Sequence, residues 1–303
     1  MKRAGTITAA HERAGVVTAA FGRHYEITLQ DGRVVNGIPR GKKSPYACGD
    51  HVTLGPLHDS EAQILAHAPR SSLLYRSDQW KEKLIAANAT QVVLVVATEP
   101  GFSDELTSRC PVAARHQRLR VVLVRNKNDL AERINAARQQ LSAFAAMDIP
   151  VVELSARADA APLRPWLSDQ VSVLVGQSGM GKSTLINALI PGAGAATREI
   201  STALDSGKHT TTHARMYALP EGGALIDSPG LQEFGLAHLT RGEIELGFAE
   251  FAPHLGQCRF RDCKHEHEPG CAIKAAIDRG EIDARRLVHF VTIASEGDRA
   301  KQF

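Results

Sequence analysis

Three almost wholly apolar runs, each followed by a polar stretch, divide the middle of the chain. They cover residues 89–97, 119–124 and 171–175. Runs of this kind are typical of parallel strands that are buried on both faces. Strands and helices are therefore expected to alternate around one mostly parallel sheet with helices on both faces, which places this part of the chain in the α/β class.

Helices are expected between these runs. Residues 102–119 predict a crossover helix with a kink or an interruption near Cys110, because Pro111 cannot donate a backbone hydrogen bond there. A short helix is expected at residues 163–167. Another helix is predicted after the second run from apolar residues at helical spacing, namely Leu130, Ile134, Leu141 and Phe144.

The first 72 residues have a different pattern, in which short alternating segments are separated by turn signals such as Asp31-Gly32. Five or so short strands in this length predict a small OB-like β-barrel. A basic loop, Arg40-Gly-Lys42-Lys43-Ser, lies between two of the strands. Loops of such barrels bind oligonucleotides, so we expect an RNA contact here, with a solvated loop as the alternative.

The composition is ordinary for a soluble protein of two or three domains: 303 residues, 43% hydrophobic and 23% charged, with a net charge of +3. The start of the chain lacks the apolar run of a secretion signal, and residues 92–97 are too few to span a bilayer. Three of the five cysteines lie within residues 258–271, which favours a metal site over a disulfide framework. We therefore expect a cytoplasmic protein without a membrane segment.

The third apolar run leads into G-x-x-x-x-G-K-S, the pattern of a phosphate-binding loop. Its glycines let successive backbone N–H groups turn toward phosphate oxygens, and the following helix adds the positive end of its dipole. We expect Lys182 to reach the β- and γ-phosphates and Ser183 to ligate Mg²⁺. The expected phosphate contacts are Gly176, Gln177, Ser178, Gly179, Met180, Gly181, Lys182, Ser183 and Thr184.

The second apolar run leads into N-K-x-D, a tetrapeptide that can read guanine: Asn126, Lys127, Asn128 and Asp129. The Asp129 carboxylate can accept hydrogen bonds from guanine N1–H and from the 2-amino group, whereas adenine offers neither pattern. Asn126 can tie the base edge to the loop, and the stem of Lys127 can cover the face of the base.

Two further motifs complete a guanine-nucleotide site. Ser155 and Ala156 follow the next predicted strand, and their backbone N–H groups are expected to meet guanine O6. Downstream lies D-x-x-G, in which Asp227 is expected to hold Mg²⁺ through water and the Gly230 N–H to contact the γ-phosphate. Thr211 is expected to complete the Mg²⁺ shell when GTP is bound.

These motifs occur in an unusual order, because the base-reading motifs precede the phosphate-binding ones. The simplest physical account is a circular permutation, in which the same sheet has its old termini joined and new termini elsewhere. The segment after Gly230, whose position depends on the γ-phosphate, then leads directly into the last part of the chain.

That last part contains C-x₄-C-x-H-x₅-C, three thiols and one imidazole suited to tetrahedral Zn²⁺. Four protein ligands leave no open position, so we expect one structural zinc, with helices at residues 272–279 and 284–296 packed over it. Buried cysteines beside a surface histidine are the alternative. His267 is a rival ligand, but its acidic neighbours favour a solvated loop. The expected ligands are Cys258, Cys263, His265 and Cys271.

Basic residues around this motif make it a second expected RNA contact. We expect three domains: the barrel at residues 1–72, a circularly permuted GTPase domain at 73–235 and a zinc-binding helical domain at 236–303. The basic residues expected to contact RNA here are Arg259, Arg261, Lys264, Arg285 and Arg286.

The chain resembles the RsgA family of bacterial small-subunit-dependent GTPases over essentially its whole length. The resemblance rests on the barrel, the permuted guanine-nucleotide domain and the C-x₄-C-x-H-x₅-C knuckle, in this order. The resemblance implies cytoplasmic hydrolysis of GTP to GDP and phosphate, weak alone and stimulated by the small (30S) ribosomal subunit. It also implies a monomer that contacts 16S rRNA during late maturation or quality control of that subunit.

Two other functions fit parts of the sequence. One is a nucleotide-regulated RNA-binding module with little turnover. The other is a P-loop ATPase or a small-molecule kinase, which is disfavoured by Asp129 and by the lack of a second-substrate motif.

The motifs leave open which residue positions the attacking water. Many GTPases carry glutamine directly after D-x-x-G, but this chain has Leu231, which cannot hydrogen-bond. His209 is our candidate, because it adjoins three threonines, residues 210–212, in the segment expected to close over the γ-phosphate. An exposed loop histidine or an rRNA contact is an equal alternative. Thr210 and Thr212 are the alternatives to Thr211 as the Mg²⁺ ligand.

Overall fold

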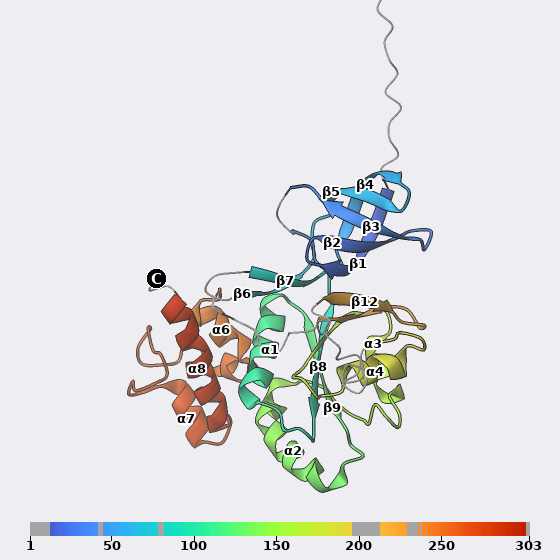
Figure 1. The fold of residues 1–303 in the computed structure, drawn as a ribbon. Helices are drawn as coiled ribbons and strands as arrows, with labels where there is room; N and C mark the ends of the chain where they lie inside the picture. The colour runs from blue at the N-terminus through green and yellow to red at the C-terminus, as the bar shows by residue number, and fades with distance from the viewer. Residues whose placement is uncertain are drawn as a thin grey trace, which may run out of the picture.

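The computed structural model describes residues 13–41, 45–77, 82–195, 213–228, 236 and 238–300. It has three parts: a barrel, a sheet with helices on both faces, and a group of helices beside the sheet (Figure 1). The chain passes through these parts in the order expected from the sequence. The domain limits at residues 72 and 235 stay predictions.

Five strands form the N-terminal barrel. β1 pairs with both β2 and β4, β3 pairs with β2 and β5, and β4 pairs with β5, which closes the ring. Alternate residues point inward, so that Tyr25, Ile27 and Ile64 are buried in a core of their own. This confirms the expected OB-like barrel. Its strands are β1 (Arg13–Phe21), β2 (His24–Leu29), β3 (Val34–Pro39), β4 (His51–His58) and β5 (Glu61–His67).

A hairpin that the sequence analysis did not anticipate follows the barrel: β6 (Leu73–Ser77) and β7 (Glu82–Ala87). Tyr75 on β6 packs against His238, with ring centroids 4.5 Å apart. The hairpin therefore contacts the segment that enters the C-terminal helices.

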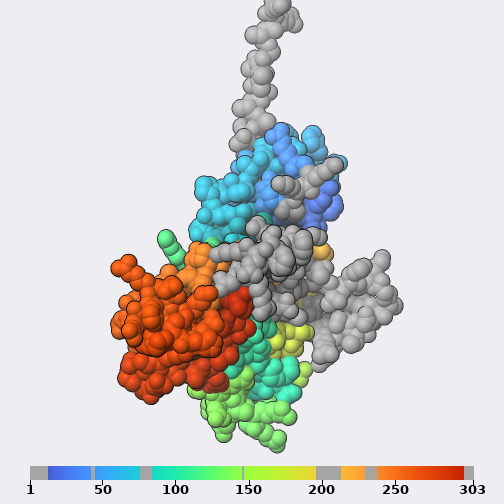
Figure 2. Space-filling model, turned by 90° about the vertical axis from the view of Figure 1, so that its left-hand side faces the viewer, coloured from blue at the N-terminus to red at the C-terminus, as the bar shows by residue number. Residues whose placement is uncertain are grey.

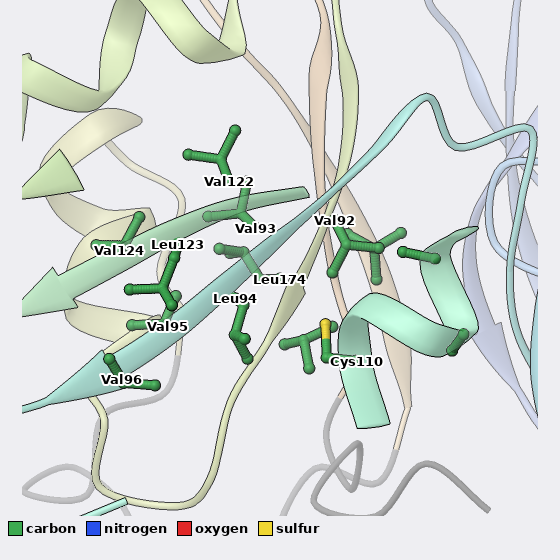
Figure 3. Packing of buried hydrophobic residues seen from close by; sticks show 14 of the residues in the cluster. Val92, Val93, Leu94, Val95, Val96, Cys110, Val122, Leu123, Val124 and Leu174 are labelled. Carbon is green, nitrogen blue, oxygen red and sulfur yellow. The ribbon is translucent and has the colours of Figure 1, made fainter. Parts of the chain in front are cut away.

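The central sheet has the strand order β10-β9-β8-β11-β13-β12. All neighbours are parallel except β12, which is antiparallel to β13. Every residue of β8 is buried, and Figure 3 shows its valines and Leu94 packed among side chains of β9, β11 and α1. The apolar runs therefore form buried parallel strands, as expected. The strands are β8 (Gln91–Ala97), β9 (Arg120–Asn126), β10 (Val151–Glu153), β11 (Val171–Val175), β12 (Ala214–Ala218) and β13 (Ala224–Asp227).

Helices cover both faces of this sheet, with α1 on one face and α3 and α4 on the other (Figure 1). α1 (Asp104–His116) is continuous, so the interruption expected near Cys110 is wrong, and the kink given as its alternative stays a prediction. Cys110 and Val112, the neighbours of Pro111, are fully buried, and this packing holds the helix through the lost hydrogen bond. The other face carries η3 (Ala161–Leu163), α3 (Arg164–Leu167) and α4 (Lys182–Leu189).

The single helix expected after β9 is divided into η1 (Ala131–Arg133), α2 (Ile134–Leu141) and η2 (Ser142–Met147). Leu130, assigned to its apolar face, is 40% exposed, because it precedes the first helical turn. Among the described residues, no helix combines the length and the apolar character that crossing a membrane requires.

The C-terminal helices pack against α1. Two of them, at residues 272–278 and 284–300, lie where helices were expected, and the two before them were not anticipated. α6 begins after Thr240, which forms a capping box with Glu243. One RNA-contact prediction is wrong here. Arg286 on α8 is fully buried, because its guanidinium pairs with Glu250 and lies over the Phe248 ring. The elements are α6 (Arg241–Gly247), η4 (Ala249–His254), α7 (Ala272–Asp278) and α8 (Ala284–Ala300).

The barrel and the central sheet are joined edge to edge. β1 pairs with β12, where Ala19 lies opposite Arg215 and Ala20 opposite Ala214. The Arg215 side chain reaches Glu26 on β2 at 3.1 Å and lies over the Phe21 ring. β1 therefore belongs to the barrel and also extends the sheet of the nucleotide motifs.

Candidate nucleotide and metal sites

The predicted nucleotide motifs follow four strands of the central sheet. N-K-x-D begins at the last residue of β9, and D-x-x-G begins at the last residue of β13. Ser155 and Ala156 follow β10, and the glycine loop follows β11. Because these strands are parallel, their carboxyl ends meet at one edge of the sheet. The fold therefore gathers at this edge motifs that lie far apart in the sequence.

Asn126 connects three of these segments through one side-chain amide. Its Nδ2 donates to the carbonyl of Met180 at 2.9 Å. Its Oδ1 accepts from the backbone N–H groups of Lys127 at 2.8 Å and Ala156 at 2.9 Å. The side chain is buried, so these bonds fix the base-reading loop against the glycine loop without competition from water.

Lys127 bridges the base-reading loop and the end of β8. Its Nζ donates to the carbonyl of Glu99 at 2.7 Å, and its own carbonyl accepts from Thr98 Oγ1 at 3.0 Å. Burial lowers the pKa of Lys127, and the charge of Arg157 acts in the same direction. The Lys127 side chain is fixed at its ammonium end, so that its methylene groups lie along the loop.

Asp129 is exposed and accepts a hydrogen bond from Ser155 Oγ at 2.5 Å. This bond lowers the pKa of the Asp129 carboxyl, so the group is an ionised acceptor at neutral pH. Its neighbour Asn128 has a buried Oδ1 with no hydrogen-bond donor within the described part of the chain. The carboxylate is thus held in place by a second motif and available to a base.

The glycine loop is fixed in shape by close packing. At Gly176, a Cβ would lie 2.3 Å from the carbonyl oxygen of Val95. Gly181 has a φ of +88°, and a Cβ there would lie 2.4 Å from Asn126 Nδ2. Only glycine fits these positions, and α4 then begins at Lys182. The loop is also tied to α1, because Gln177 Oε1 accepts from the Ser103 N–H at 2.9 Å.

Lys182 and Asp227 form the charged centre of the phosphate side. Lys182 Nζ donates to the carbonyls of Gly176 at 2.6 Å and Gln177 at 3.0 Å. Burial lowers the pKa of Lys182 and raises that of Asp227, and each charge opposes the shift of the other. Asp227 Oδ1 is buried and has no hydrogen-bond donor among the residues described. A buried carboxylate oxygen without a donor, near the start of α4 where Ser183 lies, fits a hydrated divalent cation.

Three predicted site residues lie outside the described residues: His209, Thr211 and Gly230. Of the remaining phosphate contacts, Ser178 is exposed, Met180 is buried, and Gly179, Ser183 and Thr184 are half-buried around the same loop.

The four expected metal ligands lie together at the start of α7. Their ligand atoms all lie within 4.8 Å of one another. The distances from His265 Nδ1 to the three Sγ atoms are 3.6 Å for Cys258, 3.5 Å for Cys263 and 3.2 Å for Cys271. A tetrahedral metal with ordinary metal–sulfur and metal–nitrogen bonds separates such atoms by about 3.5 Å. The cluster therefore fits a four-coordinate metal, and the rival His267 is exposed.

Glu245 orients the imidazole of this cluster. Its Oε1 lies 2.6 Å from His265 Nε2, so the ring nitrogen that faces away from the thiols carries the proton and donates it. The Ala272 N–H also points to Cys258 Sγ at 3.3 Å. Neither Glu245 nor Glu99 was anticipated from the sequence, because both act across the fold and belong to no motif.

The basic residues expected to contact RNA are only partly retained on the surface. Arg259, Arg261 and Lys264 are exposed around the metal ligands, and Arg259 lies over the half-exposed ring of Phe260. Arg40 on the barrel is exposed as well, whereas residues 42–44 of its loop lie outside the described residues.

Comparisons with known sequences agree with this arrangement. The RsgA GTPase family profile matches residues 67–237. A protein of Nitrosospira multiformis named small ribosomal subunit biogenesis GTPase RsgA is 51% identical over 266 residues, which cover 88% of this chain and 85% of that protein. A protein of the same name from Bordetella pertussis is 48% identical over 303 residues, 99% of this chain and 98% of its own.

Solved structures with the same arrangement are also known. The crystal structure of YjeQ from Thermotoga maritima has a TM-score of 0.74 and 27% identity, covering 94% of this chain and 98% of that one. The structure of YloQ, a circularly permuted GTPase, has a TM-score of 0.70 and 24% identity, covering 98% of both chains. These similarities confirm the permuted order of the sheet.

Proposed function

Because this chain belongs to the RsgA GTPase family, we propose that it couples GTP hydrolysis to late maturation or quality control of the small ribosomal subunit, through contacts with its rRNA. The chain is a GTP hydrolase of a ribosome-biogenesis family. Stimulation by the small subunit, the stage of maturation and the rRNA contacts belong to the proposal. So do action in the cytoplasm and a monomeric state.

One observation carries the nucleotide part of the proposal. Asn126 hydrogen-bonds at once to its own loop, to the segment with Ala156 and to the glycine loop at Met180. A base held by Asp129 and phosphates held by Lys182 are thus recognised by one rigid unit. This geometry supports a guanine nucleotide that spans the edge of the sheet.

Mg²⁺ bound with GTP would neutralise charge on the β- and γ-phosphates. Ser183 at the start of α4 and Asp227 at the end of β13 are the described residues that would hold it, with Thr211 completing the set in the GTP state. Lys182 would exchange its two backbone carbonyls for phosphate oxygens. Gly176 and Gly181 keep the backbone close to the phosphates.

For hydrolysis, we retain His209 as the residue that positions the attacking water. Its support is chemical: Leu231 stands where a glutamine would act, and imidazole can accept a proton from water near neutral pH. A docked ribosomal subunit that places the His209 segment over the γ-phosphate would then raise the rate by positioning alone.

The metal cluster is assigned to one structural Zn²⁺. Three thiolates and one imidazole at tetrahedral separations match zinc, and all four positions are filled by protein. The metal would hold the loop that presents Arg259, Phe260 and Arg261, a basic and aromatic set of the kind that contacts single-stranded RNA. The barrel offers the second surface, and both the barrel and the C-terminal helices are exposed in the view of Figure 2.

The proposal is tested by measuring phosphate release from GTP and from ATP, with and without purified small subunits. We expect slow GTP turnover alone, faster turnover with subunits and no ATP turnover. His209→Ala should lose the stimulation while GTP affinity and subunit binding are kept. Equal stimulation in the variant would remove His209 from the mechanism.

The nucleotide-regulated RNA-binding module remains the second candidate. It predicts nucleotide-dependent binding to the subunit with no stimulated turnover in the same assay. No described residue favours it over hydrolysis.

A further inference from the structure

The segment between β8 and α1, residues 98–103, belongs to none of the nucleotide motifs but lies against the glycine loop. A Cβ at Gly179 would lie 3.2 Å from Pro100 Cγ, so the loop packs directly on this segment. The segment also bonds to the start of the loop, because the Ser103 N–H donates to Gln177 Oε1 at 2.9 Å. The glycine loop is therefore tied to the start of α1 by one side chain, that of Gln177.

The donor of this hydrogen bond is fixed by the fold. Ser103 is the N-cap residue of α1, and its Oγ accepts from the Leu106 N–H at 3.3 Å. One turn farther along, Arg109 of α1 donates to Glu296 of α8, with Nη1–Oε2 at 2.7 Å. A backbone N–H can only donate, so Gln177 has to present its oxygen here, which sets the orientation of its amide. The glutamine is thus bonded to a helix that other elements hold in place.

The backbone of Gln177 has a second support, which a bound nucleotide would remove. Lys182 Nζ donates to the carbonyls of Gly176 at 2.6 Å and of Gln177 at 3.0 Å. A lysine at this position binds the β- and γ-phosphates, so both bonds are given up when a nucleotide enters. The side-chain bond between Gln177 and Ser103 does not involve Lys182, and it can hold the start of the loop in both states.

We propose that Gln177 is a positioning residue for the nucleotide phosphates, because it fixes the glycine loop to the start of α1. It acts through the backbone of the loop, whose N–H groups have to point toward phosphate oxygens. This role rests on the proposed binding of phosphates by the glycine loop. Loss of the bond should weaken the nucleotide-bound state more than the empty state, in which Lys182 still supports the loop.

The first test compares two glutamines that flank β11. Gln177→Met keeps the length of the side chain but removes its acceptor, and affinity for both GDP and GTP should fall about fivefold. Gln170→Met is the matched control, because Gln170 Oε1 also accepts one hydrogen bond, from Thr90 Oγ1 at 2.8 Å, but at the opposite edge of the sheet. The two variants should lose similar stability without nucleotide, as measured by thermal melts, and only Gln177→Met should lose affinity.

Two outcomes of this comparison would overturn the proposal. Wild-type affinity for GDP in Gln177→Met would show that the bond does not position the loop. An equal loss of affinity in Gln170→Met would show that any lost bond beside β11 loosens the site, so that Gln177 has no special role.

Hydrogen exchange tests the bond in the wild type, without any variant. The Ser103 N–H precedes the first helical turn and has no acceptor within α1, so its protection reports on Gln177. We expect it to be protected both without nucleotide and with GDP, and to lose protection in Gln177→Met. The Thr107 N–H, which donates to the Ser103 carbonyl at 3.0 Å, should stay protected in both proteins. Rapid exchange of the Ser103 N–H in the GDP-bound wild type would overturn the proposal.

Lys182→Ala separates this proposal from the assignment of the glycine loop, because it removes the ammonium that binds the phosphates. Wild-type GDP affinity in Lys182→Ala would place the phosphates elsewhere, and both the proposed site and the role of Gln177 would fail. If Lys182→Ala loses GDP while Gln177→Met binds it as the wild type does, the phosphate site stands and only the role of Gln177 fails.

Discussion

In the proposed function, the nucleotide is selected by a single side chain, that of Asp129. It is held by Ser155 and kept ionised, so it offers two acceptor oxygens where guanine has two donors. Asp129→Asn replaces one acceptor by a donor, and GTP binding should weaken by about 1–3 kcal/mol. Xanthosine nucleotides, which carry a carbonyl in place of the 2-amino group, should gain affinity. Fluorescence titration with both nucleotides measures this exchange.

The control for Asp129 is its hydrogen-bond partner. Ser155→Ala removes the bond that holds the carboxylate but leaves both of its oxygens, so it should weaken GTP without favouring xanthosine nucleotides. Equal affinity of the wild type for ATP and GTP would contradict the assignment of the base-reading loop.

The function proposed for Asp227, holding Mg²⁺, has a cost in stability. Burial raises its pKa, which means that the folded state disfavours the ionised form. The protonated form stabilises the fold below the unfolded pKa of about 4, and this contribution is lost as pH rises through the raised folded value. Asp227→Asn should therefore increase the free energy of unfolding of the nucleotide-free protein at neutral pH by about 0.5–2 kcal/mol. Its thermal unfolding midpoint should rise accordingly. The same variant should lose Mg²⁺-dependent GTP binding.

Thermal melts in Mg²⁺-free buffer from about pH 4 to pH 8 test this trade-off. The gap between wild type and Asp227→Asn should widen as pH rises. Asp59→Asn, at an exposed turn of the barrel, is the control and should change nothing. A variant less stable than the wild type across this range would show that the pairing with Lys182 outweighs the burial of the carboxylate.

At the scale of elements, the metal cluster depends on a contact between helix α6 and the loop that precedes α7. Glu245 on α6 orients His265 in the loop before α7. Such outer partners typically contribute 10–100-fold to metal affinity, so Glu245→Gln should weaken zinc binding by about this factor. Cys263→Ser should lose the metal and loosen the C-terminal helices, because structural zinc contributes folding free energy directly. Competition with a chromophoric chelator measures both.

GTP binding should survive both changes, because the nucleotide loops lie on the central sheet. His267→Ala is the matched control: the residue adjoins the cluster but is exposed, and its loss should leave the metal in place. Metal analysis of the wild type that finds no zinc would refute the assignment.

The sequence predicted those elements whose evidence is local. The apolar runs predicted the strands β8, β9 and β11. The motifs predicted that Asn126, Lys182 and the clustered cysteines lie in their loops, because the spacing of residues within each motif reflects one loop or one turn. Contacts across the fold were not predictable. Glu245, and the carbonyl of Glu99 that receives Lys127, have no signal in their own neighbourhood.

Two errors have the same physical origin. The sequence predicts an RNA contact for Arg286, which would require an exposed side chain, but its pairing with Glu250 and its packing on Phe248 bury it. Pro111 predicts a kink or an interruption near Cys110, but packing on both sides keeps α1 uninterrupted. In each case, a contact with another element outweighed a local tendency.

In the whole molecule, Arg286 joins the C-terminal helices to the nucleotide-binding part. Its Nη1 donates to Ser108 of α1 at 2.6 Å, and its Nε pairs with Glu250. Arg286→Ala leaves Glu250 buried and unpaired, which should cost about 3–5 kcal/mol in free energy of unfolding. Urea denaturation followed by circular dichroism measures the loss.

Its neighbour supplies the control. Arg285 has a side chain that is 40% exposed, and it pairs with Asp283 at the surface. Arg285→Ala should cost no more than about 1 kcal/mol, as exposed ion pairs do. Similar losses in the two variants would show that Arg286 is not the buried link described above.

The pairing of β1 with β12 also fixes an order of events during synthesis. The barrel can close once β5 has emerged, but β12, the strand that receives its edge, begins roughly 150 residues later, a delay of about 7–30 s at usual elongation rates. The base-reading loop is likewise made before the glycine loop that it must hold, so guanine cannot be bound until β11 has inserted beside β8. A nascent chain therefore binds its nucleotide late in synthesis. GDP added to stalled chains should protect from proteolysis only those chains that extend past β13.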